Sequence, residues 1–264
     1  MSQDGPPDEA LAGGGRTPVF RRGDVVRRRP GPWSRTVAGL LRHLDLVGFA
    51  GAPRIVGDGF DDDGWETVTF LDGWSAHPGC WPDEQLHQVG VLLADLHAAT
   101  STYRPPDEAT WQTWFGRGIG SATVVGHCDT GPWNLLARPD GDMALIDWET
   151  AGPVDPLVEL AQACWLNAQL HDDDIAERQG LPSPEARAAM VRLIADGYGL
   201  GRDARAGLVD LMIEVAVQDA ADQARQGRVT PDSGDVEALW AVTWRVRSAA
   251  WMLRHRRVLH RALA

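Results

Sequence analysis

The segment VVGHCDTGPWNLLARPDGDMALIDWE, residues 124–149, constrains the fold more than any other part of the sequence. In it, Asp140-Gly141 is a strong signal for a tight hairpin turn, and it lies between two short apolar runs. A two-residue turn there would pair residues whose numbers sum to 281, so that Asn134 would face Asp147. We therefore expect the hairpin to bring an amide oxygen and a carboxylate together, beside the loop that holds Asp129.

The polar loop before this hairpin is open to three interpretations: a metal site, a nucleophile site or a phosphate-handling loop. His127 and Cys128 are adjacent and no second cysteine pair is near, which argues against zinc. An adjacent histidine rarely points at its neighbour, which argues against a thiol nucleophile. The segment after the loop favours the third interpretation, because hard oxygen groups at strand ends suit magnesium, which also binds phosphates.

A His-x-Asp-x-x-x-x-Asn loop, a hairpin and then an aspartate form the layout of phosphotransferases of the protein-kinase type. In that layout one aspartate accepts the hydroxyl proton, while the asparagine and the second aspartate hold metal. An ordinary loop, with Asp129 and Asn134 as turn residues, would explain any single position. Four positions that match this layout in order, around a hairpin, favour the phosphotransferase.

The rest of the chain predicts two lobes. TPVFRRGDVVRRRP predicts two strands around Gly23-Asp24, WETVTFLDG predicts another, and apolar residues from Val37 to Val47 have helical spacing. From Trp81 onward the pattern is mostly helical, apart from strands around residues 123–147. The prediction is an α+β, two-lobed, protein-kinase-like fold with a flexible leader (residues 1–15), a small β-rich N-lobe (residues 16–74) and a larger, mostly helical C-lobe (residues 75–264).

Charge and composition narrow the class of function. The formal net charge of −12 argues against nonspecific nucleic-acid binding and mildly favours a cationic partner. No run approaches the roughly 18 apolar residues of a membrane span, and no signal sequence is evident, so we expect a cytoplasmic protein without a membrane partner. All basic residues are arginine, so chemistry that usually needs lysine must use a planar guanidinium.

The motifs GHCDTGPWNLL and ALIDWETAGPVDPLVELA resemble the aminoglycoside phosphotransferase and choline-kinase family. The resemblance runs from about residue 12 to the end. GPWSRTVAGLLRHL and WMLRHRRVLHRAL are similar to a bacterial branch of phosphotransferase or trifolitoxin-immunity-like proteins. The resemblance implies magnesium and ATP or GTP as co-substrate, with a hydroxyl-bearing acceptor.

Carried over by position, the family implies a role for each polar residue of the loop and hairpin. Asp129 would be the catalytic base or hydroxyl-orienting group, and His127 would brace the loop. Asn134 and Asp147 would bind magnesium. Asp155 would help to hold the loop, or would be a helix N-cap. His97 in LADLHAAT matches a family Leu-His pair and is expected to support the core.

The N-lobe departs from the family, which normally has a strand lysine for the nucleotide phosphates and a helix glutamate that holds it. Here DVVRRRP offers only arginines, and strand alternation puts Arg28 on the face opposite Arg27 and Arg29. The first predicted helix contains no glutamate. Because arginine can bind phosphate bidentately, we expect Arg27 or Arg28 at the nucleotide, together with Phe70 and Leu71.

Two further departures concern glycine. Cys128 replaces the usual glycine after His127, which adds a side chain in a tight loop. The glycine-rich entry LAGGGRTPVF could approach phosphates through its backbone N–H groups, or could be the end of a flexible leader.

The acceptor site is only suggested. LHDDDIAERQG carries Asp172, Asp173, Asp174 and Glu177, and a later segment carries Asp210, Glu214, Asp219 and Asp222. These acids would suit a cationic antibiotic or amine, or would simply face water. Trp240, Trp244 and Trp251 share one helix face and are expected in the core.

Three functions follow. The first is phosphate transfer to a hydroxyl of a small molecule, and the second is transfer to Ser or Thr of a natural-product precursor peptide. The third is a catalytically silent binding or immunity protein. The missing lysine and helix glutamate favour the third, whereas the intact Asp129, Asn134 and Asp147 oppose it.

Overall fold

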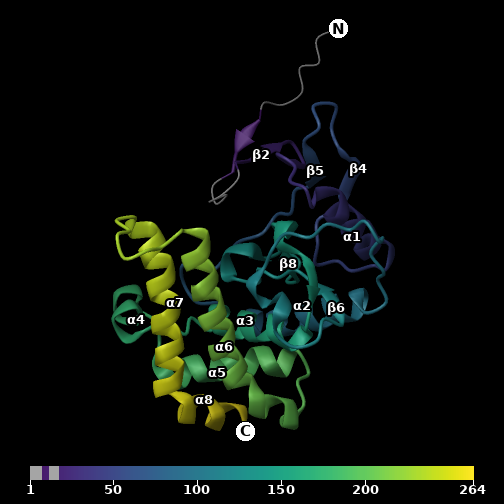
Figure 1. The fold of residues 1–264 in the computed structure, drawn as a ribbon. Coiled ribbons are helices and arrows are strands. Elements are labelled where there is room, and N and C mark those ends of the chain that lie inside the picture. The colour runs from purple at the N-terminus through teal and green to yellow at the C-terminus, as the bar shows by residue number, and fades with distance from the viewer. Residues whose placement is uncertain (1–7, 12–17) are drawn as a thin grey trace.

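The structure is a computed structural model that describes residues 8–11 and 18–264 (Figure 1). A β-sheet with one helix forms the N-terminal part, and a larger, mostly helical part lies below it. The predicted α+β, two-lobed fold is thus confirmed. Of the expected leader, only residues 8–11 are described, and Glu9–Ala10 form a short strand there. The rest of that leader, including its glycine-rich stretch at residues 12–15, lies outside the described residues.

The N-lobe sheet has the strand order β1-β2-β3-β5-β4, with every neighbouring pair antiparallel. Arg22 pairs with Val25 around the two-residue turn at Gly23-Asp24, as predicted, and Gly23 takes a φ of 62°. The strands are β1 (Glu9–Ala10), β2 (Val19–Arg22), β3 (Val25–Arg28), β4 (Ile55–Phe60) and β5 (Glu66–Thr69).

Helix α1 (Ser34–Leu46) lies between the sheet and the C-lobe (Figure 1). The apolar positions that predicted it are mostly buried, because one face of the helix packs into the core. Val47, which follows the last turn, is half exposed.

Seven helices carry the described part of the C-lobe, and α3 lies buried at their centre. Helices α2 and α5 cross so closely that a Cβ at Gly90 would lie 2.1 Å from the Ile194 carbonyl oxygen. The helices are α2 (Asp83–Thr100), α3 (Pro156–Asn167), α4 (Asp173–Gln179), α5 (Pro184–Gly197), α6 (Arg202–Gln226), α7 (Val236–Arg254) and α8 (Arg256–Leu263).

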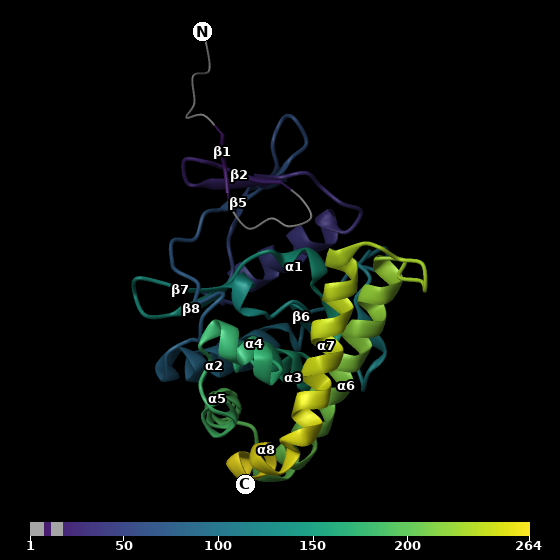
Figure 2. The same ribbon diagram turned by 90° about the vertical axis from the view of Figure 1, so that its left-hand side faces the viewer.

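Short strands and 3₁₀ turns complete the C-lobe, and the β7-β8 hairpin among them lies on the side toward the N-lobe (Figure 2). An isolated bridge between Trp74 and Ala137 joins the inter-lobe connection to the hairpin. The elements are η1 (Phe115–Gly118), β6 (Val124–Gly126) paired with β9 (Gly152–Val154), η2 (Pro132–Asn134), β7 (Leu135–Ala137) paired with β8 (Met143–Leu145), and η3 (Trp148–Thr150).

The β7-β8 hairpin forms where predicted, but its register is shifted by one residue. Leu135 pairs with Leu145 and Ala137 with Met143, so the paired numbers sum to 280. The prediction of a two-residue turn was wrong, because the loop has three residues, Pro139–Gly141. Gly141 adopts the left-handed backbone, with φ 93°, that closes a three-residue loop. Asn134 therefore lies opposite Ile146, whose N–H donates to its carbonyl at 2.9 Å.

Candidate active site

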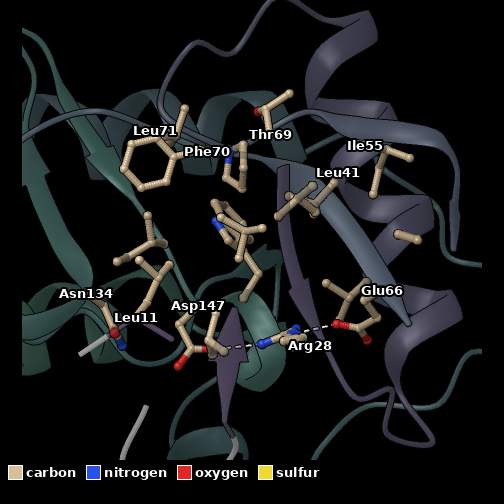
Figure 3. Close-up of a pocket in the computed structure, with 18 of the residues that line it drawn as sticks. Leu11, Arg28, Leu41, Ile55, Glu66, Thr69, Phe70, Leu71, Asn134 and Asp147 are labelled. Atoms are coloured by element: carbon tan, nitrogen blue, oxygen red, sulfur yellow. Dashed lines mark hydrogen bonds and ion pairs between the residues drawn. The ribbon is translucent and has the colours of Figure 1, made fainter. Parts of the chain in front are cut away.

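A cleft of about 320 Å³ lies between the N-lobe sheet, helix α1 and the β7-β8 hairpin (Figure 3). Its walls are mostly apolar side chains from both lobes, and four polar side chains lie along one end of it (Figure 3). These side chains are Arg28, Glu66, Asn134 and Asp147. An apolar pocket that ends in a few convergent polar groups is the usual form of a small-molecule site.

Strand alternation decides which arginine reaches this cleft. On β3, Val26 and Arg28 line it, so Arg27 is on the other face of the sheet. There the guanidinium of Arg27 is paired with Asp8, Asp61 and Asp63. Of the two arginines expected at the nucleotide, the structure brings only Arg28 to the cleft.

Arg28 pairs with a glutamate after all, but from a strand. Its cross-strand partner in the sheet is Glu66 on β5, and the two side chains form an ion pair (Figure 3). Burial lowers the pKa of Arg28, but attraction to Glu66 and Asp147 outweighs it, so the net shift is upward. The family's usual glutamate comes from a helix, which has none here, whereas Glu66 pairs with Arg28 from strand β5.

The same guanidinium joins the lobes. Arg28 Nη1 lies 2.7 Å from Asp147 Oδ1 and 3.8 Å from Glu149 Oε2, so one N-lobe cation faces two C-lobe carboxylates. Burial raises the pKa of Glu66 and the charge of Asp147 adds to it, whereas Arg28 opposes both. Phe70 and Leu71, which follow β5, line the cleft as well (Figure 3).

The loop between β6 and η2 is held by buried side chains. His127 is fully buried, its Nε2 lies 2.8 Å from the Ile146 carbonyl oxygen, and its ring packs edge-on against Trp148. Burial lowers the pKa of His127, so the neutral ring donates to that carbonyl. His127 thus ties the loop to the strand end before Asp147.

Cys128 adopts a left-handed backbone with φ 64°, the region that favours the glycine usual at this position. Its N–H donates to Glu159 Oε1 at 2.5 Å, and its thiol is buried near Arg117. Burial raises the pKa of this thiol far above its usual range, so Cys128 is an inert packing residue. None of the three cysteines forms a disulfide.

Glu159 of α3 was not foreseen. It is fully buried and accepts from His97 Nε2 at 2.7 Å as well as from the Cys128 N–H. His97 also bonds the hydroxyl of Tyr198, so the core-support role predicted for it is observed. The sequence did contain a signal for this role, since Glu159 is the lone acid in the apolar helix segment PLVELA. A charge buried in such a segment requires polar partners.

Asp155 caps α3, accepting from the Leu157 N–H at 2.9 Å, and its other oxygen accepts from the Ser121 N–H. The N-cap alternative is therefore observed, and the carboxylate also fixes the segment before β6.

Asn134 and Asp147 are the candidate metal ligands. Asn134 donates its amide N–H to the Asp129 carbonyl at 3.0 Å, which leaves its amide oxygen as the group that can bind metal. Asp147, at φ 61°, has a left-handed backbone, and both side chains line the same cleft (Figure 3). Two hard oxygen donors in one cleft fit magnesium, which takes its other ligands from phosphates and water.

Asp129 has an unusual electrostatic environment. Burial raises its pKa to about 7, the charges of Asp147 and Asp219 contribute, and hydrogen bonds from Asn134 and Trp133 partly oppose the rise. A carboxyl group that titrates near neutrality suits proton acceptance from a hydroxyl.

The acids expected to bind a cationic acceptor are largely occupied. Asp172 pairs with Arg247 and Arg254 of α7, and Asp173 accepts from the Trp251 indole at 2.8 Å. Asp219 pairs with Arg245 at 2.6 Å. These contacts tie α4 and α6 to α7.

Of the three tryptophans expected in the core, Trp251 is buried, Trp244 is partly buried and Trp240 is 47% exposed. The core prediction was wrong for Trp240, because this side chain borders a surface groove, whereas Trp251 is packed fully inside the lobe.

A sheet-containing lobe, a helical lobe and a cleft closed by this loop and hairpin define a two-lobed, kinase-like fold. The profile of the phosphotransferase enzyme family matches residues 107–208, which include the loop, the hairpin and α3. The trifolitoxin immunity protein of Rhizobium leguminosarum bv. trifolii is 58% identical over 255 residues, which cover 96% of this chain and 98% of that protein. The chain belongs to this phosphotransferase family, in the branch of that immunity protein.

Solved structures share the fold at low identity. A choline/ethanolamine kinase family protein from Mesorhizobium loti has a TM-score of 0.62 at 17% identity, covering 97% of this chain and 92% of that one. Amicoumacin kinase, in complex with AMP-PNP, Ca²⁺ and Ami, has a TM-score of 0.67 at 11% identity, covering 92% and 88%. Spectinomycin phosphotransferase, with ADP and its antibiotic, has a TM-score of 0.60 at 12% identity, covering 94% and 93%. Within the described residues, no helix is both long and apolar enough to cross a membrane.

Proposed function

We propose that this protein transfers the γ-phosphate of ATP or GTP, with magnesium, to a hydroxyl of a small molecule. The observation that carries the proposal is the meeting of Arg28 from the N-lobe with Asp147 from the C-lobe, beside Asn134, in one cleft. A permanent cation on one side, and a magnesium ion held by two hard oxygen ligands on the other, would together neutralise phosphates.

The N-lobe would bind the nucleotide. Phe70 and Leu71 would contact its apolar part, and Arg28, aligned by Glu66, would bind its phosphates. Magnesium, held by Asn134 and Asp147, would supply charge neutralisation at the phosphates. Residues 16–74 are accordingly the proposed nucleotide-binding lobe, and residues 75–264 the catalytic and acceptor-binding lobe.

Asp129 would orient the acceptor hydroxyl and take its proton. The acceptor oxygen forms a bond to the γ-phosphorus, the bond from that phosphorus to the bridging oxygen breaks, and the nucleoside diphosphate leaves with that electron pair. His127 would act as a positioning residue, because it fixes the loop through the Ile146 carbonyl.

One experiment tests this division of labour by making the same change at two positions. Asp129→Asn should lower phosphate transfer by about 10²- to 10⁴-fold, the usual contribution of a general base. Its nucleotide affinity should change by less than about fivefold, equivalent to about 1 kcal/mol. Asp147→Asn should instead abolish the gain in nucleotide affinity that magnesium gives, measured by calorimetric titration with and without the metal.

A second candidate is protection by binding alone, without transfer, and the name of the 58% identical relative, an immunity protein, favours it. The same Asp129→Asn variant separates the two. If the protection or product made by the wild type survives this change intact, the transfer function is wrong. An acceptor that is Ser or Thr of a precursor peptide would use the same residues.

A further inference from the structure

A second groove, of about 270 Å³, lies on the C-lobe, on the other side of the η2 turn from the first. Its walls come from the segment before α2, from η2, from the end of α3 and the residues after it, and from α4 and α7. Its lining includes His77, Trp133, Leu166, His171, Trp240 and Trp244. Helix α7, which carries two of these tryptophans, is held beside α4 by the Arg247–Asp172 ion pair (Figure 2).

Trp133 connects this groove to the reacting centre. Its side chain lines both the inter-lobe cleft and the groove. It also lies close enough to the carboxylate of Asp129 to lower the pKa of that group. On the groove side its ring meets His77 edge-on, with ring centroids 5.7 Å apart. A molecule in the groove would therefore lie one side chain away from both the nucleotide cleft and the proposed proton acceptor.

One side chain that lines the groove, that of His171, carries a buried polar atom without a partner. Gln169 donates its amide N–H to the Gly79 carbonyl, so its oxygen faces His171 Nε2 at 3.0 Å and must accept from it. This fixes the proton of the neutral ring on Nε2, and Nδ1 becomes an acceptor. Among the described residues, nothing bonds that buried Nδ1 atom. A buried polar atom left unpaired needs a partner, and a ligand group or an ordered water that donates to Nδ1 would supply one.

The charges around the groove disfavour a cation. Among the described residues that line it, none is acidic. The Arg187 guanidinium donates to the backbone carbonyl of His171 at 2.8 Å, which places a positive charge at this lining residue. The cation position over Trp244 is already taken by Arg245, 4.3 Å from its ring centroid, and Arg245 is neutralised by Asp219.

We propose that this groove binds the acceptor, and that the acceptor is an uncharged molecule with a planar unsaturated ring and an N–H or O–H donor for His171 Nδ1. The proposal rests on the proposed transfer function, since the groove shares Trp133 with the inter-lobe cleft. Trp133, Trp240 and Trp244 supply flat apolar surfaces for such a ring, which stacks by its faces or edges. The polycationic antibiotic or amine suggested by the acidic segments is not what these walls fit.

The test uses the full chain and a probe of the proposed chemistry, indole-3-ethanol, which has a planar ring, an N–H donor and a primary hydroxyl. Binding is followed by ligand-observed NMR titration without nucleotide or metal, so it does not depend on transfer. We expect indole-3-ethanol to bind, and choline and kanamycin, the cationic probes, to bind at least tenfold more weakly. Tighter binding of either cation would overturn the proposal.

Three single variants test where indole-3-ethanol binds. Trp240→Ala, on the exposed rim, should weaken indole-3-ethanol binding at least fivefold, and His171→Leu, which removes the acceptor atom, should weaken it at least threefold. Leu239→Ala, the neighbouring exposed position on α7 that does not line the groove, should leave it unchanged. If Trp240→Ala binds the probe as the wild type does, the groove is not the site.

The two proposals fail separately. Loss of transfer to every acceptor, with indole-3-ethanol still bound in a Trp240-dependent manner, would refute the transfer function and leave the groove as a ring-binding site. Transfer to a cationic acceptor, with no binding of indole-3-ethanol, would support the transfer function and refute the groove as a site for uncharged rings.

Discussion

Replacing Arg28 tests whether an arginine does the work of the missing lysine. Arg28→Met keeps the side-chain length and removes the charge that faces Glu66 and Asp147. A hydrogen bond to a charged group contributes about 1.5–3 kcal/mol, so the affinity for magnesium nucleotide should fall by about 10- to 150-fold. Calorimetric titration with a non-hydrolysable ATP analogue measures this directly.

The same substitution should lower stability, because it leaves Glu66 buried beside Asp147 without a counter-charge. Breaking a buried ion pair destabilises by about 3–5 kcal/mol. The Arg28 and Glu66 side chains are 14% and 12% exposed but that of Asp147 is 42% exposed, so we expect the lower end, about 3 kcal/mol. The double variant Arg28→Met with Glu66→Gln should recover much of this loss, as urea denaturation would show, without recovering nucleotide affinity.

Arg27→Met is the matched control, one residue away and on the opposite face. It breaks the contacts with Asp8 and Asp61, so it should also destabilise the N-lobe. Its nucleotide affinity should nevertheless stay within about threefold of the wild type, which is less than about 1 kcal/mol. Equal losses of affinity in the Arg27 and Arg28 variants, or a loss in Arg27 alone, would refute the assignment of Arg28.

The remaining predictions concern two residues of the loop, Asp129 and Cys128. Because the pKa of Asp129 is raised to about 7, phosphate transfer should increase as pH rises through about 7, and a pH–rate profile checks this. The folded carboxyl then holds a proton between about pH 4 and 7 that the unfolded one has lost, so stability should decrease as pH rises through this window, and less so in Asp129→Asn. At Cys128, with φ 64°, Cys128→Gly should change the free energy of unfolding by less than about 1 kcal/mol. Cys128→Val places a β-branched residue in the left-handed region and should destabilise by about 1–3 kcal/mol, and a smaller loss in thermal denaturation would contradict the strain argument.

The sequence by itself determined the features that depend on local chain geometry. The Gly23-Asp24 hairpin, the α1 and α2 helices and the existence of the β7-β8 hairpin follow from turn residues and apolar spacing within short windows. The order of Asp129, Asn134 and Asp147 along one loop and hairpin was enough to predict a phosphotransferase. Strand alternation separated Arg27 from Arg28 but could not say which face was the cleft.

The tertiary structure decided everything that needed a partner distant in sequence. Glu66 could be recognised only once β3 and β5 were paired, since the pairing of strands 38 residues apart is not a local property. The hairpin register depended on a single glycine conformation at Gly141, and one residue of shift reverses the direction of every side chain. The acids of α4 looked available for a substrate because their α7 partners lie more than 70 residues away, and only packing brings Arg247 to Asp172. Burial, which raises the pKa of Asp129 and isolates His171 Nδ1, likewise exists only in the folded chain, because it depends on which surfaces exclude water.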